Sequence, residues 1–341
     1  MKTKKTFIFT LLLISFGFLL AGCKNKNAVS VAQNVSFSQA ENEKKVDKKF
    51  CIVSTIYPVY DWVENLTKNV PSVSNTLLVK NGRDMHSYQA SAKDIIDISS
   101  SSLFIFVGGE SDSWVYDVLD SHPEVQAVNL MNILGSRVKM EEIAEGMQKE
   151  EENYGAAEGN AEVADEHIWL SLRNAEKICS ELARILEKED PSHLNLYRLN
   201  LVSYITKLSA LDISYQNTVS FAKYDTLFFC DRFPFRYMTE DYNLKYYAAF
   251  AGCSAENNAS FETMAFLSEK LKSLELNTVL VLEKSDRKLA KAVIKNAGKE
   301  GKAQILEMNS IQNVTDKDIK NGKDYLSAMK ENLEVLKKAL N

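Results

Sequence analysis

The feature that most constrains this chain is a regular alternation of short apolar segments with helical segments, which begins near Cys51. The segment 103–107 is continuously apolar and ends at two glycines, as a buried strand does. Between such segments lie stretches with helical spacing, including 91–99, which opens with a Ser-x-x-Asp capping signal. We predict strands at 51–56, 76–79, 103–107, 126–130, 226–230, 245–250, 278–282 and 303–306. This order of elements predicts an α/β fold with mostly parallel sheets.

A long helix is expected between the two groups of strands. From Pro191 to Ala222 apolar residues recur at steps of three and four, which places them on one helix face. A helix of about 30 residues spans about 45 Å. The sequence therefore predicts two lobes, each a mostly parallel sheet flanked by helices, joined by one long rigid helix. The N-terminal lobe is expected at 49–190, the linking helix at 191–222 and the C-terminal lobe at 223–341.

The first 22 residues have the pattern of a secretory signal peptide. Three lysines precede an apolar run of 14 residues, 7–20, whereas a membrane-spanning helix needs about 20. The sequence Leu20-Ala21-Gly22-Cys23 resembles the bacterial lipobox, in which the chain is cut before a cysteine that carries acyl chains. We therefore expect a lipid anchor on Cys23, a flexible tether over 23–48, and attachment to the outer side of the cell membrane. A short N-terminal membrane anchor is the alternative that the sequence leaves open.

The charge of the chain argues against one class of partner. The chain has 41 basic and 46 acidic residues, a net charge of −5, and no block rich in lysine or arginine. Since nucleic-acid-binding proteins usually have a basic face, we expect no nucleic-acid partner. The segment 141–166 contains ten acidic residues and one lysine. We predict that it is a solvated acidic loop, and a role in attracting cations is the open alternative.

Two of the four histidines are placed where they could bind a ligand. His122 lies in a turn and His193 at a helix start, and both are expected at the surface. His86 follows the strand predicted at 76–79 in a polar, glycine-containing loop, and His167 ends the acidic loop just before a helix. Neutral imidazoles at two loop ends suit Zn²⁺, Mn²⁺ or similar cations. The 81 residues between them exclude a local zinc-finger spacing.

Several motifs resemble those of one protein family over residues 51–341. They are Ser54-Thr-Ile-Tyr-Pro-Val-Tyr, Gly82-Arg-Asp-Met-His-Ser-Tyr88, Asp165-Glu-His-Ile-Trp-Leu170, Tyr197-x-x-Asn200-x-x-x-Tyr204 and Tyr325-x-x-x-Met329-x-x-Asn332-Leu333. Together they resemble the metal-specific substrate-binding lipoproteins of bacterial ABC importers, the zinc and manganese receptor family. Met85 departs from the family pattern, which has proline there. The resemblance implies one metal ion between the lobes, bound by His86, His167 and two ligands from the C-terminal lobe.

The resemblance also implies where the other two ligands lie. The third family position, three residues before a Phe-x-Tyr motif, is occupied here by Arg232, which cannot bind a cation. We therefore expect its neighbour Asp231 to be the third ligand. The fourth family position is an acid and is occupied here by Asn309, a neutral oxygen donor. Glu283, at the end of a predicted strand, is the alternative carboxylate or an additional group near the ion.

The cysteines leave more than one interpretation open. Cys230 and Cys253 flank the region of the expected third ligand, and they could form a disulfide, bind a soft metal or simply be buried. Cys179 lies on a predicted helix and is expected in the core.

The expected function is metal capture without catalysis. The resemblance implies a monomeric receptor that binds a transition-metal ion as transported ligand, zinc in preference to manganese, and delivers it to an ABC permease and its ATPase. A metal-dependent hydrolase and a surface adhesin are the alternatives. The chain contains no His-Glu-x-x-His, Gly-x-Ser-x-Gly or P-loop motif, so none of these enzyme signatures supports the hydrolase.

Overall fold

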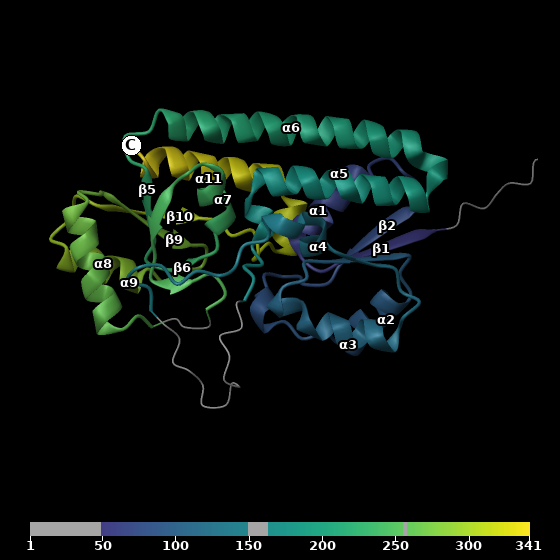
Figure 1. Cartoon of the computed structure of the whole chain (residues 1–341), viewed down its shortest axis with the longest axis horizontal. Coiled ribbons are helices and arrows are strands. Elements are labelled where there is room, and N and C mark those ends of the chain that lie inside the picture. The colour runs from purple at the N-terminus through teal and green to yellow at the C-terminus, as the bar shows by residue number, and fades with distance from the viewer. Residues whose placement is uncertain (1–48, 149–162, 255–257) are drawn as a thin grey trace, which may run out of the picture. The chain divides into compact units, whose positions relative to one another are not determined.

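The computed structural model describes residues 49–148, 163–254 and 258–341, and these residues belong to one compact unit (Figure 1). The predicted signal peptide, Cys23 and the tether to residue 48 lie outside the described residues, as does the middle of the acidic loop, 149–162. Within the described ranges, no helix has both the length and the apolar character needed to cross a membrane.

The N-terminal half, residues 49–190, is built on one parallel sheet. Its strand order is β2-β1-β3-β4 and every pairing is parallel. β3 is buried along its whole length, as expected for a strand covered on both faces. The elements are β1 Phe50–Ser54, α1 Tyr57–Leu66, β2 Val73–Leu77, α2 Ala92–Ser99, β3 Leu103–Phe106, α3 Ser113–Ser121, β4 Ala127–Asn129, α4 Leu130–Leu134 and α5 Leu172–Glu189. Short 3-10 helices lie at η1 Met85–Ser87, η2 Glu110–Asp112, η3 Gly135–Arg137, η4 Ile168–Leu170 and η5 Pro191–His193.

The C-terminal half, residues 223–341, contains parallel strand pairs. β9 pairs with β10, β5 with β7 and β6 with β8, and a parallel bridge between Phe229 and Leu280 connects the end of β5 to β9. The elements are β5 Thr226–Phe228, β6 Arg232–Phe233, α7 Arg236–Asp241, β7 Lys245–Tyr247, β8 Phe250–Ala251, α8 Phe261–Ser273, β9 Thr278–Leu282, α9 Lys288–Asn296, β10 Gln304–Met308, α10 Asp316–Lys320 and α11 Tyr325–Ala339. The strand predicted at 245–250 is therefore two short strands with different partners.

The long helix α6 runs from Leu194 to Ser220 and follows the 3-10 turn η5. Its 27 residues correspond to about 40 Å. It buries Tyr197, Tyr204 and Leu211 on one face, as the spacing predicted, and contacts α1, α5 and α11. Figure 1 shows α6 extending alongside α5 and α11 from the β1–β2 end of the molecule to β5. The α/β fold with parallel sheets and a long connecting helix is confirmed.

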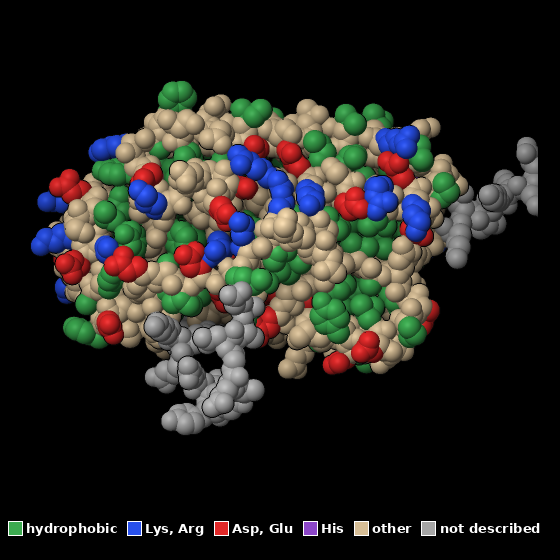
Figure 2. Space-filling view, viewed as in Figure 1, with side chains coloured by type: hydrophobic (Ala, Val, Ile, Leu, Met, Phe, Trp, Pro, Cys, Tyr) green, Lys and Arg blue, Asp and Glu red, His purple; other side chains and the backbone are tan. Residues whose placement is uncertain are grey.

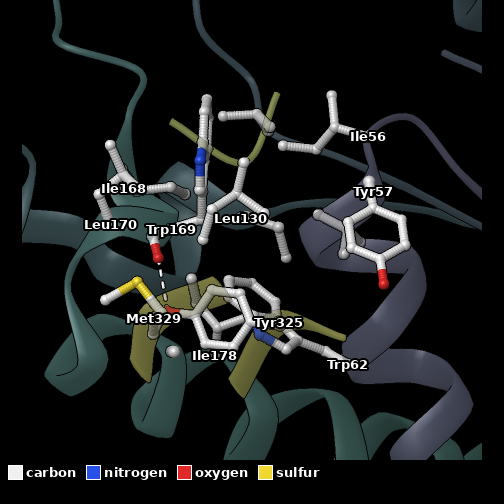
Figure 3. Close-up of a cluster of buried hydrophobic side chains, with 14 of the residues drawn as sticks. Ile56, Tyr57, Trp62, Leu130, Ile168, Trp169, Leu170, Ile178, Tyr325 and Met329 are labelled. Atoms are coloured by element: carbon white, nitrogen blue, oxygen red, sulfur yellow. Dashed lines mark hydrogen bonds between the residues drawn. The ribbon is translucent and has the colours of Figure 1, made fainter. Parts of the chain in front are cut away.

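The main hydrophobic core contains residues from both halves. Figure 3 shows its centre, where Trp169 lies among side chains of α1, α5 and α11. The ring of Trp62 meets that of Tyr325 edge-on at 5.3 Å, and the Tyr325 hydroxyl donates a hydrogen bond of 2.6 Å to the carbonyl of Trp169. The Trp169 indole in turn donates a hydrogen bond of 2.8 Å to the carbonyl of Ser310. These contacts fix the segment after His167 against the C-terminal half.

Charged side chains of both signs are distributed over the described surface. In Figure 2, lysine and arginine side chains lie among aspartate and glutamate, and no broad basic area is visible on that face. Several of the basic residues form ion pairs, for example Arg236 with Glu142 at 2.6 Å and Lys270 with Glu145 at 3.2 Å. These two pairs attach the first part of the acidic segment, residues 141–148, to the C-terminal half.

Candidate metal centre

His86 is held on a short turn after the second strand of the N-terminal sheet. The turn η1 starts at Asp84, whose carboxylate accepts a hydrogen bond of 3.1 Å from the His86 amide, and the buried Met85 side chain anchors it. The Nδ1 atom of His86 lies 2.9 Å from Oε1 of Glu166 and 2.9 Å from Oγ of Ser111. Ser111 belongs to η2, which follows β3, so the ring is positioned at the carboxyl end of the sheet, where ligands of such folds bind.

His167 is completely buried at the start of the core segment 168–170. Its Nδ1 atom lies 3.0 Å from Oδ1 of Asp165, and the same oxygen accepts a hydrogen bond of 2.9 Å from the His167 amide. The His86 and His167 ring centroids are 5.4 Å apart, with an angle of 51° between the ring planes. The fold thus brings together the two histidines that the sequence singled out.

The Nε2 atoms of both rings are buried and have no hydrogen-bond partner. A carboxylate only accepts, so the Nδ1 atom facing it carries the proton, and Nε2 of a neutral ring keeps its lone pair. Carboxylates on the outer nitrogen fix the orientation of metal-binding histidines in just this way. Two buried lone pairs without a donor are costly in an apolar interior, and a bound cation would satisfy both.

Cys253 completes a group of three possible metal ligands. One ligand atom from each of His86, His167 and Cys253 lies within 4.8 Å of the others. Cys253 follows β8 and Gly252 in the C-terminal half, and its amide donates a hydrogen bond of 2.9 Å to Oε1 of Glu141. The group therefore combines two residues of the N-terminal half with one of the C-terminal half.

Buried acidic side chains shape the electrostatics of this group. Burial would raise the pKa of Glu166, but the hydrogen bond and charge of His86 outweigh it, so the pKa is lowered. Burial would lower the pKa of His167, but the charge and hydrogen bond of Asp165 raise it. Burial, with the charges of Glu166 and Glu141, raises the pKa of the Cys253 thiol. Negative charge around two imidazoles favours a cation at their centre.

The other ligands expected from the sequence are not part of this group. Asp231 accepts hydrogen bonds from the amides of Arg232 at 2.9 Å and Leu282 at 3.2 Å. Asn309 uses its side-chain oxygen to accept a hydrogen bond of 2.7 Å from the Ile311 amide. Both residues therefore stabilise loops next to β9 and β10, and Asp231 is not in the group of ligand atoms that contains the two histidines.

Glu283 and Arg232 are also engaged elsewhere. Glu283 accepts hydrogen bonds from the amide and hydroxyl of Ser310 at 2.8 and 2.5 Å, and Arg232 lies 3.4 Å from the Asp84 carboxylate. Together with Asp231, they line a polar cavity of about 420 Å³ to which neither histidine contributes.

The sequence analysis left Cys253 open, together with Cys230, as a disulfide partner, a soft-metal ligand or a buried residue, and did not place it with the two histidines. All four cysteines of the described chain, Cys51, Cys179, Cys230 and Cys253, are free thiols, so the disulfide considered between Cys230 and Cys253 is not formed. Cys179 is buried on α5, as predicted. The signal that could have identified Cys253 is its position directly after a glycine at the end of an apolar segment, the same kind of loop start that identified His86.

Comparison with known proteins gives one consistent family. The family described as "Zinc-uptake complex component A periplasmic" (ZnuA) matches residues 52–339. The chain is 30% identical over 296 residues to the zinc-binding lipoprotein AdcA of Streptococcus pneumoniae, which covers 87% of this chain and 57% of AdcA. It is 27% identical over 323 residues, 94% of each chain, to the high-affinity zinc uptake system protein ZnuA of Bacillus subtilis. The chain thus spans little more than half the length of the AdcA relatives it matches.

Solved structures agree with this assignment. The Zn(II)-bound ZnuA-like domain of Streptococcus pneumoniae AdcA is 26% identical, with a TM-score of 0.67 over 86% of this chain and 99% of that domain. The metal-dependent lipoprotein YcdH from Bacillus subtilis is 25% identical, with a TM-score of 0.68 over 86% of this chain and 99% of YcdH. Laminin-binding proteins of streptococci share the fold at 18–19% identity.

Proposed function

This chain belongs to the family of periplasmic zinc-uptake components, and we propose that it is an extracytoplasmic receptor that captures Zn²⁺ and delivers it to an ABC permease with its ATPase. The observation that carries this proposal is the pair of buried Nε2 atoms of His86 and His167, which have no hydrogen-bond partner although the two ring centroids are 5.4 Å apart. Their outer nitrogens are both held by carboxylates. This is the arrangement expected of neutral imidazoles that bind a metal ion.

Zinc is the favoured cargo. Imidazole nitrogens suit zinc, whereas manganese prefers carboxylate, carbonyl and water oxygens. The oxygen ligands that would have favoured manganese, Asp231 and Asn309, are hydrogen-bonded to backbone amides away from the histidines. The similar proteins AdcA and ZnuA are also named for zinc binding or zinc uptake.

Binding without catalysis agrees with the surroundings of the histidines. A group of three ligands would leave one position of a tetrahedral zinc ion open, so catalysis would further need a free general base that activates water. The two nearest carboxylates, Asp165 and Glu166, already hold the imidazole rings. Nothing among the described residues favours the hydrolase, and the likeness to the adhesins extends to the fold alone. We therefore propose a transport receptor.

The decisive measurement is competitive titration of zinc against manganese with the wild-type protein and single variants. We expect His86→Ala and His167→Ala each to lower zinc affinity at least tenfold, which corresponds to about 1.4 kcal/mol. His122→Ala is the matched control, because His122 lies at the end of α3 and is not part of the group. If the zinc titration curve of either variant matches that of the wild-type protein, the replaced histidine is not a ligand.

Membrane attachment is a separate part of the proposal. We infer that Cys23 carries the lipid anchor, supported by the lipobox-like sequence and by the lipoprotein name of the similar AdcA. Cell fractionation of a Cys23→Ala variant tests this inference. The variant should appear in the soluble extracytoplasmic fraction, and an acylated, membrane-bound variant would contradict the assignment of the anchor to Cys23.

A further inference from the structure

We propose that Cys253 binds the captured ion as a thiolate, so that the receptor uses a His-His-Cys ligand set that selects zinc and softer cations over manganese. This inference rests on the proposed function, because it concerns the ion held by His86 and His167. It replaces the oxygen ligands predicted from the sequence by a sulfur ligand from the same half of the chain.

The distances place the sulfur within reach of both imidazoles. The three ligand atoms lie within 4.8 Å of one another. Tetrahedral zinc with Zn–N bonds of about 2.0–2.1 Å and Zn–S bonds of about 2.3 Å would require them to be about 3.3–3.6 Å apart. No pair has to close by more than about 1.5 Å, a shift that side-chain rotation can supply.

The backbone before Cys253 is shaped to approach the histidine. A Cβ atom at Gly252 would lie 3.0 Å from Cε1 of His167 and 3.0 Å from the carbonyl oxygen of Phe233, which is closer than ordinary contacts. Only glycine lets the chain pass this close to the ring without displacing it. The hydrogen bond from the Cys253 amide to Glu141 then fixes the direction in which the chain leaves the site.

In the C-terminal half, the carboxylates near the site already accept hydrogen bonds, and Cys253 provides a thiol there. Asp231 and Glu283 accept hydrogen bonds from backbone amides, at Leu282 and Ser310 respectively. Arg232 is a cation and is paired with Asp84. Cys253 is the residue of this half that joins the histidines in the group, and a bond to it would connect the two halves through the ion.

The choice of ligand has a consequence for selectivity. Thiolate sulfur is a soft ligand that binds zinc well and manganese poorly, whereas a carboxylate in the same position would narrow the difference between the two ions. Two histidines alone would accept several divalent ions. With the sulfur as an additional ligand, the site discriminates against manganese. We expect the preference for zinc over manganese to fall at least tenfold when the sulfur is removed.

Cobalt binding gives a direct test, because a cobalt–thiolate bond produces a charge-transfer absorption in the near ultraviolet that histidine and carboxylate ligands do not. Titration of the wild-type protein with Co²⁺ should produce this band, and zinc should abolish it. The band should be absent from Cys253→Ser and present in the matched control Cys51→Ser, since Cys51 lies in β1 outside the group.

The outcomes separate this inference from the proposed function. If zinc binding depends on His86 but the wild-type cobalt complex lacks the sulfur band, or if the band persists in Cys253→Ser, the thiolate ligand is refuted and the receptor function stands. If the wild-type protein binds neither ion, both proposals fail. Absence of the sulfur band from the wild-type cobalt complex refutes the thiolate ligand even if the serine variant does not fold.

Discussion

Replacing Asp61 by asparagine should remove a pH dependence of stability from the junction of three helices. Asp61 lies on α1 and is buried, and its Oδ2 atom accepts hydrogen bonds from the Tyr204 hydroxyl at 3.3 Å and from Asn65 at 3.2 Å. Burial, followed by the charge of Asp324, raises the pKa of Asp61 to about 7, although the Tyr325 amide and the Tyr204 hydroxyl act in the opposite direction. The pKa of the Asp61 carboxyl group therefore depends on the packing of α1 against α6 and α11.

The direction of the effect follows from the two pKa values of Asp61. A pKa raised from 3.8 to about 7 means that the folded protein keeps a proton that the unfolded chain has already released. The free energy of unfolding therefore falls as the pH rises through this interval. The whole shift corresponds to about 4 kcal/mol, of which about 3 kcal/mol is lost between about pH 5 and about pH 8.

Denaturant unfolding over this pH range measures the effect. Asparagine keeps an oxygen that can accept a hydrogen bond from Tyr204 but cannot ionise. The stability of Asp61→Asn relative to wild type should therefore increase by about 3 kcal/mol between about pH 5 and about pH 8. Asp120→Asn, at an exposed site on α3, controls for the loss of a charge. Unfolding curves of Asp61→Asn and wild type that keep a constant separation at every pH would refute the argument.

Three further expectations concern the core and the metal centre. Tyr325→Phe should lower the free energy of unfolding by about 1–3 kcal/mol, measured by denaturant unfolding, because the buried carbonyl of Trp169 loses its hydrogen-bond donor. Gly252→Ala should weaken zinc binding in calorimetric titration and also lower the stability of the zinc-free protein, because its Cβ would push against the buried His167 ring and the Phe233 carbonyl. Zinc at about 100 times its Kd should stabilise the wild-type protein by about 2.7 kcal/mol, seen as a higher Tm, and small-angle scattering should show little contraction; a large contraction would contradict the stiffness expected of α6.

The sequence predicted the type and order of the larger elements because their signals are local. The capping box at Ser91 and Asp94 starts α2, and the spacing of apolar residues located α6 to within a few residues at each end. The short elements were less accessible. The strand predicted at 76–79 is β2 at Val73–Leu77, whose apolar pattern is interrupted by Asn75 because that side chain bonds Tyr60 and Ser54.

Other differences between the predicted and the observed strands arise because strands pair with segments that lie far away in the sequence. The apolar segment 245–250 is divided because Lys245–Tyr247 pairs with β5 while Phe250–Ala251 pairs with β6. The strand predicted at 126–130 ends at Asn129, whose side chain caps the short helix α4. Pairing partners and five-residue helices leave little trace in hydrophobic periodicity, which averages over longer windows.

For the candidate site too, some residues could be predicted from the sequence and some contacts could not. His86 and His167 could be found because polar residues at loop starts next to strands and helices are recognisable one at a time. The contact of His86 with Glu166 could not, since it depends on how the chain between them folds, and the local contact of His167 with Asp165 has no pattern in the sequence that indicates its geometry. Asp231 was expected from its proximity to Arg232 in sequence and stays a prediction, whereas the hydrogen bonds that its carboxylate accepts from the amides of Arg232 and Leu282 could not be predicted from the sequence.

The contacts that fix the two histidines also explain why capture of an ion should change the structure only locally. The segment after His167 is bonded to the C-terminal half through Trp169 and Ser310. The turn before His86 is bonded to the same half by Lys284, which donates to the Gly82 carbonyl at 3.0 Å, and by the pair of Arg232 with Asp84. None of these contacts includes a candidate ligand atom, so they hold the two halves together whether or not an ion is bound. Of the candidate ligands, His86 and Cys253 are partly exposed while His167 is fully buried. An ion arriving from solvent therefore meets His86 and Cys253 before it reaches His167, and the carboxylates of Glu166 and Asp165 already hold the two imidazole rings in place.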